Sequence, residues 1–492
     1  MPAEKKRQQN YSTITHSIML GLAVLALSLF GILSRLQLDL ATFWPANAFV
    51  LGMLVRFPGL ARPASWLSAA AGFLIADTVT GSSWWVSIIL NGGNLLAIAT
   101  GYGIFRLLPL QDRSLASPRA VLCFLRAILA AACVAGLIGF VAHPPLFGGT
   151  PLEGLLFWSA TEAVNHAAFL PLLLTLPPLT KLRIRNRRKL PVRSHLVRAM
   201  PLIALMISAM AAAIVGGPGA LAFPVPALLW CALSYSLFST ACLTFAFGAW
   251  TLLTIRTGIM PMGIDTASRE MLISIRVGVT LVALGPLVVA SVMASREELL
   301  EKMRRLAEED AMTGLRNRRS FFETGSAALQ SKADRARDIT VMMLDIDHFK
   351  AINDRHGHDG GDMVLVGFAE ILKKNVRDTD IIGRWGGEEF AVLMPGCDAK
   401  AAASTAQRII EAMRSERFRS SESAPMAATV SIGVHTDRSN TDLERRLMLA
   451  DRALYQAKEA GRDQFIMSAI ASQGLSGAIH EVIVSSPSSP PQ

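Results

Sequence analysis

The sequence predicts two halves of different fold class, a membrane α-helical bundle followed by a cytoplasmic α/β domain. The chain of 492 residues is 51% hydrophobic and only 17% charged, with a mean hydropathy of +0.39, whereas soluble domains carry roughly 25% charged residues. The long apolar stretches end near residue 294, where charged residues and soluble patterns begin. This composition excludes an intrinsically disordered chain, a collagen and a small disulfide scaffold.

Residues 1–294 contain successive apolar stretches of roughly 17–25 residues, the length that crosses a bilayer. Because several are short or adjoin one another, we expect eight to ten spans. The first lacks a small-residue cleavage pattern and is followed by others, so it is interpreted as a span and not as a signal peptide. The expected spans are 18–35, 41–56, 64–79, 84–107, 118–142, 153–178, 197–216, 220–235, 236–255 and 274–294.

The positive charge of the chain belongs to this apolar half. Residues 1–294 hold 8 acidic and 21 basic residues, a net charge of +13, whereas the remaining 198 residues have a net charge of −3. In a ten-span topology with an internal N-terminus, the basic residues gather in the internal loops, eight of them between Lys181 and Arg198. This bias predicts a multi-pass protein whose second half is cytoplasmic, and it argues against nucleic-acid binding.

Three ionisable residues, Asp77, Glu162 and His166, lie inside expected spans. Burying such groups in a membrane is costly, so they are candidates for a functional site or for a polar clamp between helices. Glu162, Asn165 and His166 share one helix face at three- and four-residue spacing. Three further asparagines are expected to form hydrogen bonds between helices, and three tryptophans to lie in an interfacial belt: Asn47, Asn91 and Asn94, then Trp44, Trp84 and Trp85.

Residues 295–309 change character abruptly. Leu299, Leu300, Met303 and Leu306 recur at three- and four-residue steps among charged residues. The pattern predicts an amphipathic helix that continues from the last span and pairs with a second copy of itself. A solvated linker helix is the alternative.

Residues 310–467 follow a soluble α/β pattern, and the tail 468–492 is expected to be disordered. A buried strand is expected at 339–347, and two strands around a glycine turn at 380–395. A further strand is expected at 428–436. Helices are expected at 360–376, 401–418 and 441–461.

Three carboxylates are expected to converge in this second domain. Asp345 ends the buried strand, and Glu388 and Glu389 begin the second arm of the hairpin. Carboxylates suit Mg²⁺ or Mn²⁺, which bind through one or two of them together with substrate phosphates. Glycines give a bulky ligand room, and cations meet phosphate: Gly386 and Gly387, then Lys350, Lys458 and Arg462. With no P-loop in the sequence, the set indicates metal-dependent nucleotidyl transfer.

The motifs around these residues have a specific order. D-A-M-T-G-L-R-N-R-R (310–319) is followed by L-D-I-D-H-F-K-x-I-N-D (344–354) and G-x-D-G-G-D (357–362). R-W-G-G-E-E-F (384–390) and A-D-x-A-L-Y-x-A-K-x-x-G-R (450–462) complete the series. This series closely resembles the GGDEF family of diguanylate cyclases. The resemblance implies a palm-like cyclase fold, in which two domains of a homodimer each hold one GTP and metal and together make cyclic di-GMP and pyrophosphate.

The resemblance also implies roles for individual residues. Asp345, Glu388 and the carbonyl of Ile346 match the metal ligands, and Glu389 matches a position that helps to bind metal or activates the attacking 3′-hydroxyl. The amides of Phe349 and Lys350 match phosphate contacts, as do the side chains of Lys458 and Arg462. Asn353 and Asp362 match the residues that read guanine. Glu388 replaces the aspartate at the third position of the family motif and keeps the carboxylate.

A second motif predicts product inhibition. Arg377 and Asp380 match the family's R-x-x-D inhibitory site for cyclic di-GMP, at the expected distance before Gly386. Arg384 and Arg408 are expected to add charge nearby. Taken without that spacing, the motif reads as a charged surface turn.

The first half resembles the first type of membrane-associated sensor domain of bacterial signalling proteins, through F-W-P-A-N (43–47) and N-G-G-N-L-L-A (91–97). That resemblance implies a sensor in the bacterial inner membrane. Two alternatives stay open: a transporter or channel with a regulatory nucleotide-binding tail, and a degenerate GGDEF domain that serves only as a receptor. The complete carboxylate set favours the enzyme.

Overall fold

The computed structural model describes residues 2–33, 44–177, 192–262, 269–330, 338–418, 426–438 and 441–468. The chain divides into two compact units, Met1–Leu299 and Leu300–Gln492. Each unit is described by itself. The expected tail lies outside the described residues apart from Ser468, as does much of the basic loop from Lys181.

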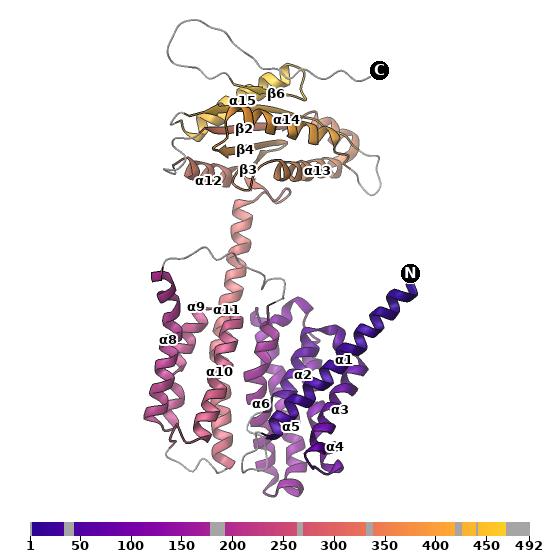
Figure 1. The fold of residues 1–492 in the computed structure, drawn as a ribbon, viewed down its shortest axis with the longest axis vertical. Coiled ribbons are helices and arrows are strands. Elements are labelled where there is room, and N and C mark those ends of the chain that lie inside the picture. Colours follow the sequence, from indigo (N-terminus) through magenta and orange to yellow (C-terminus); the bar gives the residue numbers. More distant parts are fainter. Residues whose placement is uncertain are drawn as a thin grey trace. The chain divides into compact units, whose positions relative to one another are not determined.

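The first unit is built of α-helices (Figure 1). Each expected apolar stretch with described residues coincides with a helix or with part of one. The helices are α1 (Pro2–Leu33), α2 (Pro45–Arg56), α3 (Pro63–Val79), α4 (Trp84–Phe105), α5 (Pro118–Phe147), α6 (Pro151–Thr175), α8 (Val192–Val215), α9 (Val225–Ser234), α10 (Leu237–Arg256) and α11 (Arg269–Glu308).

Six helices of the described chain are long and apolar enough to cross a membrane. They support the predicted membrane bundle, while the expected count of eight to ten spans stays a prediction. The six segments are Ile14–Leu33, Trp84–Phe105, Pro118–Phe147, Leu196–Val215, Leu237–Ile255 and Glu270–Glu308.

Helices α5 and α6 approach each other closely through glycines. A Cβ atom added to Gly139 would overlap the carbonyl oxygen of Gly154, and a Cβ added to Gly154 would overlap that of Gly139. Small residues permit such backbone contact between membrane helices. This contact fixes the position of α6, the helix that carries Glu162 and His166.

Helix α11 is continuous from Arg269 to Glu308, and its 40 residues have a length of about 60 Å at 1.5 Å per residue. It therefore includes both the last expected span and the amphipathic segment 295–309, as predicted. The apolar stripe of that segment is exposed in the single chain, with Leu299, Leu300, Met303 and Leu306 between 53% and 77% accessible.

The second unit is a six-stranded sheet with helices on both faces (Figure 1). The strand order is β1-β3-β4-β2-β5-β6, and the strands around β2 and β4 are antiparallel. The strands are β1 (Arg316–Asn317), β2 (Ile339–Ile346), β3 (Ile381–Gly386), β4 (Glu389–Pro395), β5 (Val430–Asp437) and β6 (Phe465–Met467). The helices are α12 (Arg318–Gln330), α13 (Phe349–Asn375), α14 (Ala399–Ser415) and α15 (Leu443–Glu459).

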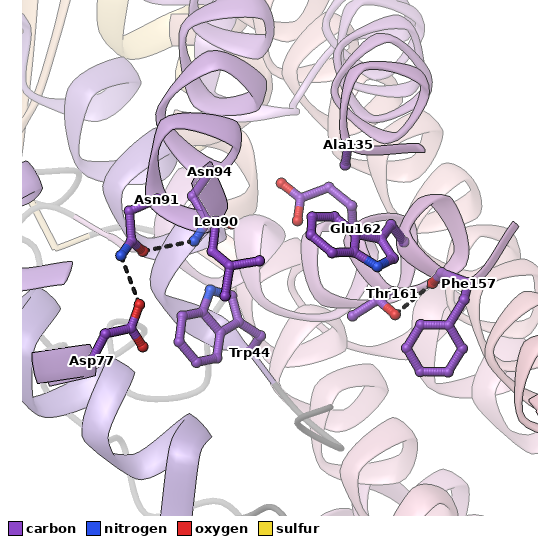
Figure 2. A pocket seen from close by; sticks show the side chains of 10 residues that line it. Trp44, Asp77, Leu90, Asn91, Asn94, Ala135, Phe157, Thr161 and Glu162 are labelled. Atoms are coloured by element: carbon purple, nitrogen blue, oxygen red, sulfur yellow. Dashed lines mark hydrogen bonds between the residues drawn. The ribbon is translucent and has the colours of Figure 1, made fainter. Parts of the chain in front are cut away.

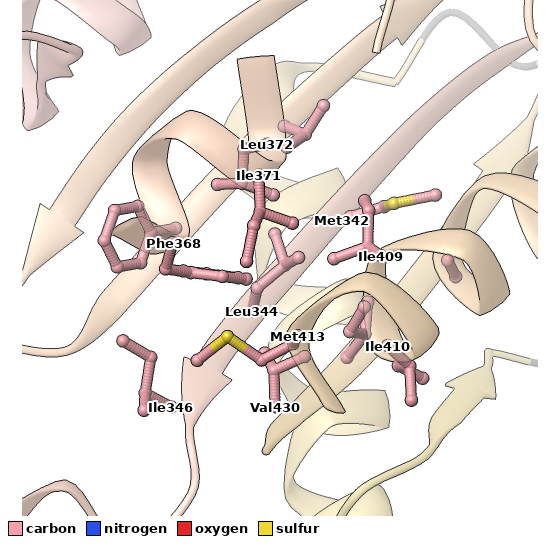
Figure 3. Close-up of a cluster of buried hydrophobic side chains, with 14 of the residues drawn as sticks. Met342, Leu344, Ile346, Phe368, Ile371, Leu372, Ile409, Ile410, Met413 and Val430 are labelled. Carbon is pink, nitrogen blue, oxygen red and sulfur yellow. The ribbon is translucent and has the colours of Figure 1, made fainter. Parts of the chain in front are cut away.

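Strand β2 is buried on both faces, and its side chains alternate between two cores. Met342, Leu344 and Ile346 pack against α13 and α14 in the larger core (Figure 3). Val341 and Met343 pack on the opposite face, against residues of α12 and α15. By this alternation Asp345 belongs to the face covered by α12 and α15.

These two units confirm the predicted fold class, a helical half followed by an α/β half. Every strand and helix expected between residues 339 and 461 is present, and all but one lie within three residues of their expected bounds. The exception is α13, which begins at Phe349, eleven residues before its expected start. Helix α12 and the short strands β1 and β6 were not expected either. Their sequences are short or strongly polar and carry little periodicity.

Candidate active site

The pairing of β2 with β4 places two of the predicted carboxylates side by side. Asp345 lies opposite Glu389 in the antiparallel register, and such partners point to the same face with Cβ atoms about 5 Å apart. Asp345 is buried and Glu389 is half-buried. The two side chains therefore meet at the end of the sheet, on the face covered by α12 and α15.

The hairpin between β3 and β4 brings in the third carboxylate. Gly386 pairs with Glu389, which leaves Gly387 and Glu388 as a two-residue turn. Gly387 has a φ of 51°, the left-handed conformation that such turns require. The amide of Ile346 donates a hydrogen bond of 3.3 Å to the carbonyl of Glu388, so the turn is joined to the end of β2.

The surroundings of Asp345 in this cluster raise its pKa. Burial, together with the negative charges of Glu388 and Glu389, raises its pKa to about 6, although Lys458 acts in the opposite direction. The Nζ atom of Lys458 lies 2.7 Å from Asp345 Oδ2. A buried carboxylate that is repelled by two neighbours and reached by one lysine has the electrostatics of a cation site.

The donor set fits a divalent ion that is completed by a substrate. Among the described residues, no group of three His, Cys, Asp or Glu side chains is arranged to hold a metal ion unaided. Magnesium characteristically uses one or two carboxylates and takes its other ligands from water and phosphates. Asp345 and Glu388, at adjoining strand ends, match that pattern.

The second aspartate of the D-I-D motif is structural. Asp347 accepts hydrogen bonds from Thr429 Oγ1 at 2.7 Å, from Ser431 Oγ at 2.6 Å and from the amide of Asp463 at 3.1 Å. These bonds engage both oxygens of its carboxylate and tie the end of β2 to the turn that contains Arg462. Sequence analysis assigned Asp347 no role, and its neighbours in space, more than 80 residues away, are not recognisable from local pattern.

The residues expected to read guanine are brought together by a kink. Helix α13 is interrupted at Gly357 (φ 73°, ψ 172°), so Asn353 and Asp362 lie on two different helical segments. A Cβ atom added to Gly361 would overlap Asn353 Oδ1, which places the asparagine amide against the backbone beside Asp362. Asp362 is exposed and Asn353 is half-buried.

The expected phosphate contacts come from two helix ends. Phe349 and Lys350 form the first turn of α13, where unpaired backbone amides favour anions. Lys458 lies in the last turn of α15. Arg462 follows in a turn closed by a 3.0 Å hydrogen bond from its amide to the carbonyl of Ala457, and its φ is 63°.

A clamp that sequence analysis missed holds the hairpin. Arg384 donates from Nε and Nη2 to the carbonyl of Gly387, at 2.9 and 2.7 Å, and from Nη1 to Asp310 at 3.0 Å. Asp310 is only partly buried, and hydrogen bonds from Thr313 and Arg384 hold its pKa below the usual range. The opening motif of the domain is thereby joined to the turn between β3 and β4.

This clamp corrects the expectation that Arg384 adds charge to the inhibitory motif, because its guanidinium is committed to Asp310 and Gly387. Arg377 and Asp380 themselves form a closed turn. The Arg377 amide donates to Asp380 Oδ2 at 2.9 Å, and the Asp380 amide donates to the Arg377 carbonyl at 3.0 Å. The turn precedes β3, whereas Gly386 ends it, so the motif and the hairpin lie at opposite ends of one strand.

A cleft of about 850 Å³ lies beside Glu389 on the α12–α15 face. The guanidinium of Arg318 lies 4.5 Å from the centre of the Trp385 ring in its wall. The remaining lining is a mixture of acidic and apolar side chains with one more arginine: Arg319, Phe322, Glu323, Met343, Glu444, Leu447, Met448 and Asp451. Glu389 thus faces a space large enough for part of a nucleotide.

The chain resembles known proteins along most of its length. Residues 307–464 match the family described as diguanylate cyclase, GGDEF domain. The probable diguanylate cyclase DgcF of Escherichia coli O157:H7 is 31% identical over 464 residues, which cover 91% of this chain and 94% of the relative. DgcF of Escherichia coli strain K12 is 36% identical over 272 residues, which cover 54% and 85%.

Among solved structures, the coiled coil and GGDEF domain of DgcB from Caulobacter crescentus in complex with c-di-GMP is 32% identical. It covers 36% of this chain and 92% of its own, with a TM-score of 0.34.

Proposed function

Since this chain belongs to the GGDEF family of diguanylate cyclases, we propose that it is a membrane-bound sensor enzyme. It condenses two GTP molecules into cyclic di-GMP and releases pyrophosphate, under control of its helical half. The observation that carries the proposal is the convergence of Asp345, Glu388 and Glu389 at one end of the sheet.

Asp345, Glu388 and the carbonyl of Ile346 are the proposed ligands of Mg²⁺ or Mn²⁺. Bound there, the ion would stabilise negative charge on the attacked phosphate and on the leaving pyrophosphate. Lys458 is 32% exposed and carries its charge on a flexible stem. It can therefore leave Asp345 for a phosphate oxygen when a metal takes its place.

The proposed substrate contacts follow the geometry of α13. Asn353 and Asp362 read the guanine edge, because an aspartate accepts from guanine N–H groups that adenine does not offer. The amides of Phe349 and Lys350, with Arg462, hold the phosphates. Gly386 and Gly387, beside which a Cβ atom would meet no neighbour, leave the hairpin open to the nucleotide. Glu389 faces the reacting end, where it accepts the proton of the attacking 3′-hydroxyl or assists the metal.

The reaction requires two copies of the chain, because each domain holds one GTP. The exposed apolar stripe of residues 295–309 on α11 is the proposed contact between copies. The proposed domain limits are accordingly a membrane sensor at 1–294, a signalling helix at 295–309, a cyclase domain at 310–467 and a tail at 468–492.

The apolar helices and the positive-inside bias support a multi-pass location in the bacterial inner membrane, with the cyclase domain in the cytoplasm.

Arg377 and Asp380 form the proposed inhibitory site for cyclic di-GMP. Arg377 is exposed and can make forked bonds to a guanine edge or a phosphate. Burial raises the pKa of Asp380, whose second oxygen lacks a hydrogen-bond partner among the described residues.

The full chain in lipid nanodiscs, supplied with GTP and Mg²⁺, tests this function. We expect cyclic di-GMP and pyrophosphate in a molar ratio of about one to two, and no cyclic product from ATP. Hydrolysis of GTP without a cyclic product, or equal use of ATP, contradicts the proposal.

A further inference from the structure

The helical half contains a polar pocket of about 100 Å³ (Figure 2). Its lining comes from the start of α2 and from four further helices, α3 to α6. Two carboxylates, Asp77 and Glu162, line it together with asparagine amides and aromatic rings (Figure 2). The full lining is Trp44, Asp77, Leu90, Asn91, Asn94, Ala135, Phe157, Trp158, Thr161 and Glu162.

Asparagine amides connect the two carboxylates. Asn91 Nδ2 donates to Asp77 Oδ2 at 2.7 Å, and Asn94 Nδ2 donates to Asn91 Oδ1 at 3.2 Å. Asn47 Nδ2 then donates both to Asn94 Oδ1 at 3.0 Å and to Glu162 Oε2 at 3.0 Å. The expected interhelical asparagine bonds are thus present, and they run as one chain from Asp77 to Glu162.

His166 lies one helical turn after Glu162, with its Nδ1 atom 3.5 Å from Glu162 Oε1. His166 Nδ1 lies 3.0 Å from the carbonyl oxygen of Glu162, an acceptor only, so Nδ1 carries a proton. Its Nε2 atom is buried and has no hydrogen-bond partner among the described residues. Besides this histidine, the amide of Asn47 donates to both carboxylate oxygens of Glu162. Both ionisable residues that line the pocket are acidic.

The walls and the size select the kind of cation. Trp44, Phe157 and Trp158 present aromatic rings, which attract organic cations. Trp44, which was expected in an interfacial belt, is half-buried in this wall. By the measure in which one water needs roughly 10–15 Å³, the volume holds about seven to ten waters, more than a bare metal ion fills. We propose that the pocket binds a small organic cation of about seven non-hydrogen atoms, either a protonated primary amine or a quaternary ammonium ion.

The pocket lies toward the non-cytoplasmic end of the bundle in the predicted topology. Asp77 is near the end of α3, and Phe157 is two turns after the start of α6. The adjoining loops at 80–83 and 148–150 carry no basic residue, whereas the basic loops follow the other ends of these helices. The cation consequently enters from outside the cell.

One arginine joins the pocket wall to the output helix. Arg276, in the second turn of α11, is buried within the first unit. It donates from Nη1 to Thr161 Oγ1, and its guanidinium lies 4.4 Å from the centre of the Phe157 ring. Both partners line the pocket, so a bound cation that draws on the Phe157 ring competes with Arg276. Occupancy is thereby coupled to α11, a step that rests on the proposed cyclase function.

Calorimetry on the full chain in nanodiscs tests the binding. The probes are choline and n-pentylamine, with 3,3-dimethylbutan-1-ol as the neutral counterpart of choline, identical in shape and atom count. Empty nanodiscs correct for partition into lipid. We expect saturable binding of at least one cation and at least tenfold weaker binding of the alcohol. Binding of the alcohol within twofold of choline, or no saturable heat from either cation up to about 10 mM, overturns the proposal.

A matched pair of variants on α6 locates the site. Glu162→Gln removes the buried charge and should weaken cation binding at least tenfold, while Glu162→Asp should restore part of it. Glu153→Gln makes the same change at a half-buried position in the first turn of the helix and preserves the capping box with Thr150. Equal affinity of Glu162→Gln and Glu153→Gln overturns the assignment, and the comparison with the alcohol needs no variant at all.

The coupling has its own readout, the rate of cyclic di-GMP synthesis with and without the bound cation. We expect a change of at least threefold in the wild-type chain and in Arg296→Gln, whose side chain is exposed on α11. In Arg276→Gln the cation should still bind within about threefold, but the rate should no longer respond. A persistent response in Arg276→Gln overturns the coupling. Normal cyclase activity without cation binding refutes the pocket alone, whereas binding without any cyclase activity refutes the proposed function.

Discussion

Asp345 in the cyclase domain and Glu162 in the helical bundle are equally buried, each 5% exposed, but their partners differ. Asp345 meets the mobile cation of Lys458 and two further carboxylates. Glu162 meets the fixed amide of Asn47 and a histidine whose remaining nitrogen lacks a partner among the described residues. We propose that the first arrangement exchanges the lysine for a metal ion. In the second, we propose that the carboxylate faces a cationic ligand.

This difference predicts that removing one carboxylate from the cyclase cluster has the largest effect of any single change. Glu388→Ala takes away a proposed metal ligand from an exposed turn, and kcat should fall at least about 10²–10³-fold. The melting temperature should change little, because the side chain is half-exposed. Glu411→Ala, an exposed change on α14, is the control. Turnover retained in Glu388→Ala would contradict the assignment of Glu388 as a metal ligand.

Breaking the hairpin clamp should have the next largest effect. Arg384→Ala removes two hydrogen bonds to Gly387 and the link to Asp310, so the turn loses its fixed position. A displacement of about 1 Å at a catalytic group costs up to roughly 100-fold in rate, and we expect a loss of 10–100-fold in kcat. Arg408→Ala breaks a similar bond, of 2.8 Å to the Asn375 carbonyl, away from the hairpin. Equal initial rates in the two variants would show that the clamp does not position the turn.

Product inhibition through the turn of Arg377 and Asp380 should not depend on the carboxylates of the cyclase cluster or of the pocket. Arg377→Ala removes the exposed guanidinium proposed to hold cyclic di-GMP, and the inhibition constant should rise at least about tenfold, or 1.4 kcal/mol. Progress curves with added cyclic di-GMP measure it. Arg445→Ala, an exposed change on α15, should leave inhibition unaltered. Unchanged inhibition in Arg377→Ala would contradict the assignment of this motif.

The smallest expected effect is on stability. The folded pKa of Asp345, about 6, exceeds its ordinary value of 3.8, so the fold binds this proton more tightly than the unfolded chain does. Metal-free stability therefore falls as the pH rises from about 4 to 6, by on the order of 1–3 kcal/mol. Asp345→Asn should raise the metal-free melting temperature at pH 8 by a few degrees, and this gain should vanish near pH 4. A lower melting temperature for Asp345→Asn at pH 8 would contradict the electrostatic account.

Much of the cyclase domain was predictable from its sequence. The secondary structure favoured by the local sequence is there the same as the one that the tertiary contacts stabilise. The strand at Ile339–Ile346 and the glycine turn at Gly387 follow from hydrophobicity and from the backbone conformation that glycine allows. The clamp of Arg384 on Asp310 was not predictable, since 74 residues separate the two partners and neither carries a distinguishing pattern.

The pocket in the helical half marks the other limit of sequence analysis. Asp77, Glu162 and His166 were recognised as ionisable residues that are costly to bury in a membrane. A polar clamp between helices and a ligand site both use such residues, so the sequence does not distinguish the two. Their arrangement depends on which helices adjoin, and apolar helices carry little information about their neighbours. Trp44 illustrates this: its aromatic ring fits an interfacial belt as well as it fits a pocket wall.

The central claim is that the helical half controls the cyclase through the rigid helix α11, and the register of this helix tests it most directly. Two residues inserted after Glu298 rotate the following domain by about 200°, whereas seven rotate it by about 700° and return it to within about 20°. The insertion point precedes Ala307, whose carbonyl accepts a bond from Asn317, so the start of the cyclase domain stays intact. Cyclic di-GMP synthesis by the full chains in nanodiscs is the readout. The account predicts a change of at least tenfold for two residues and less than threefold for seven, and equal rates from both chains would contradict it.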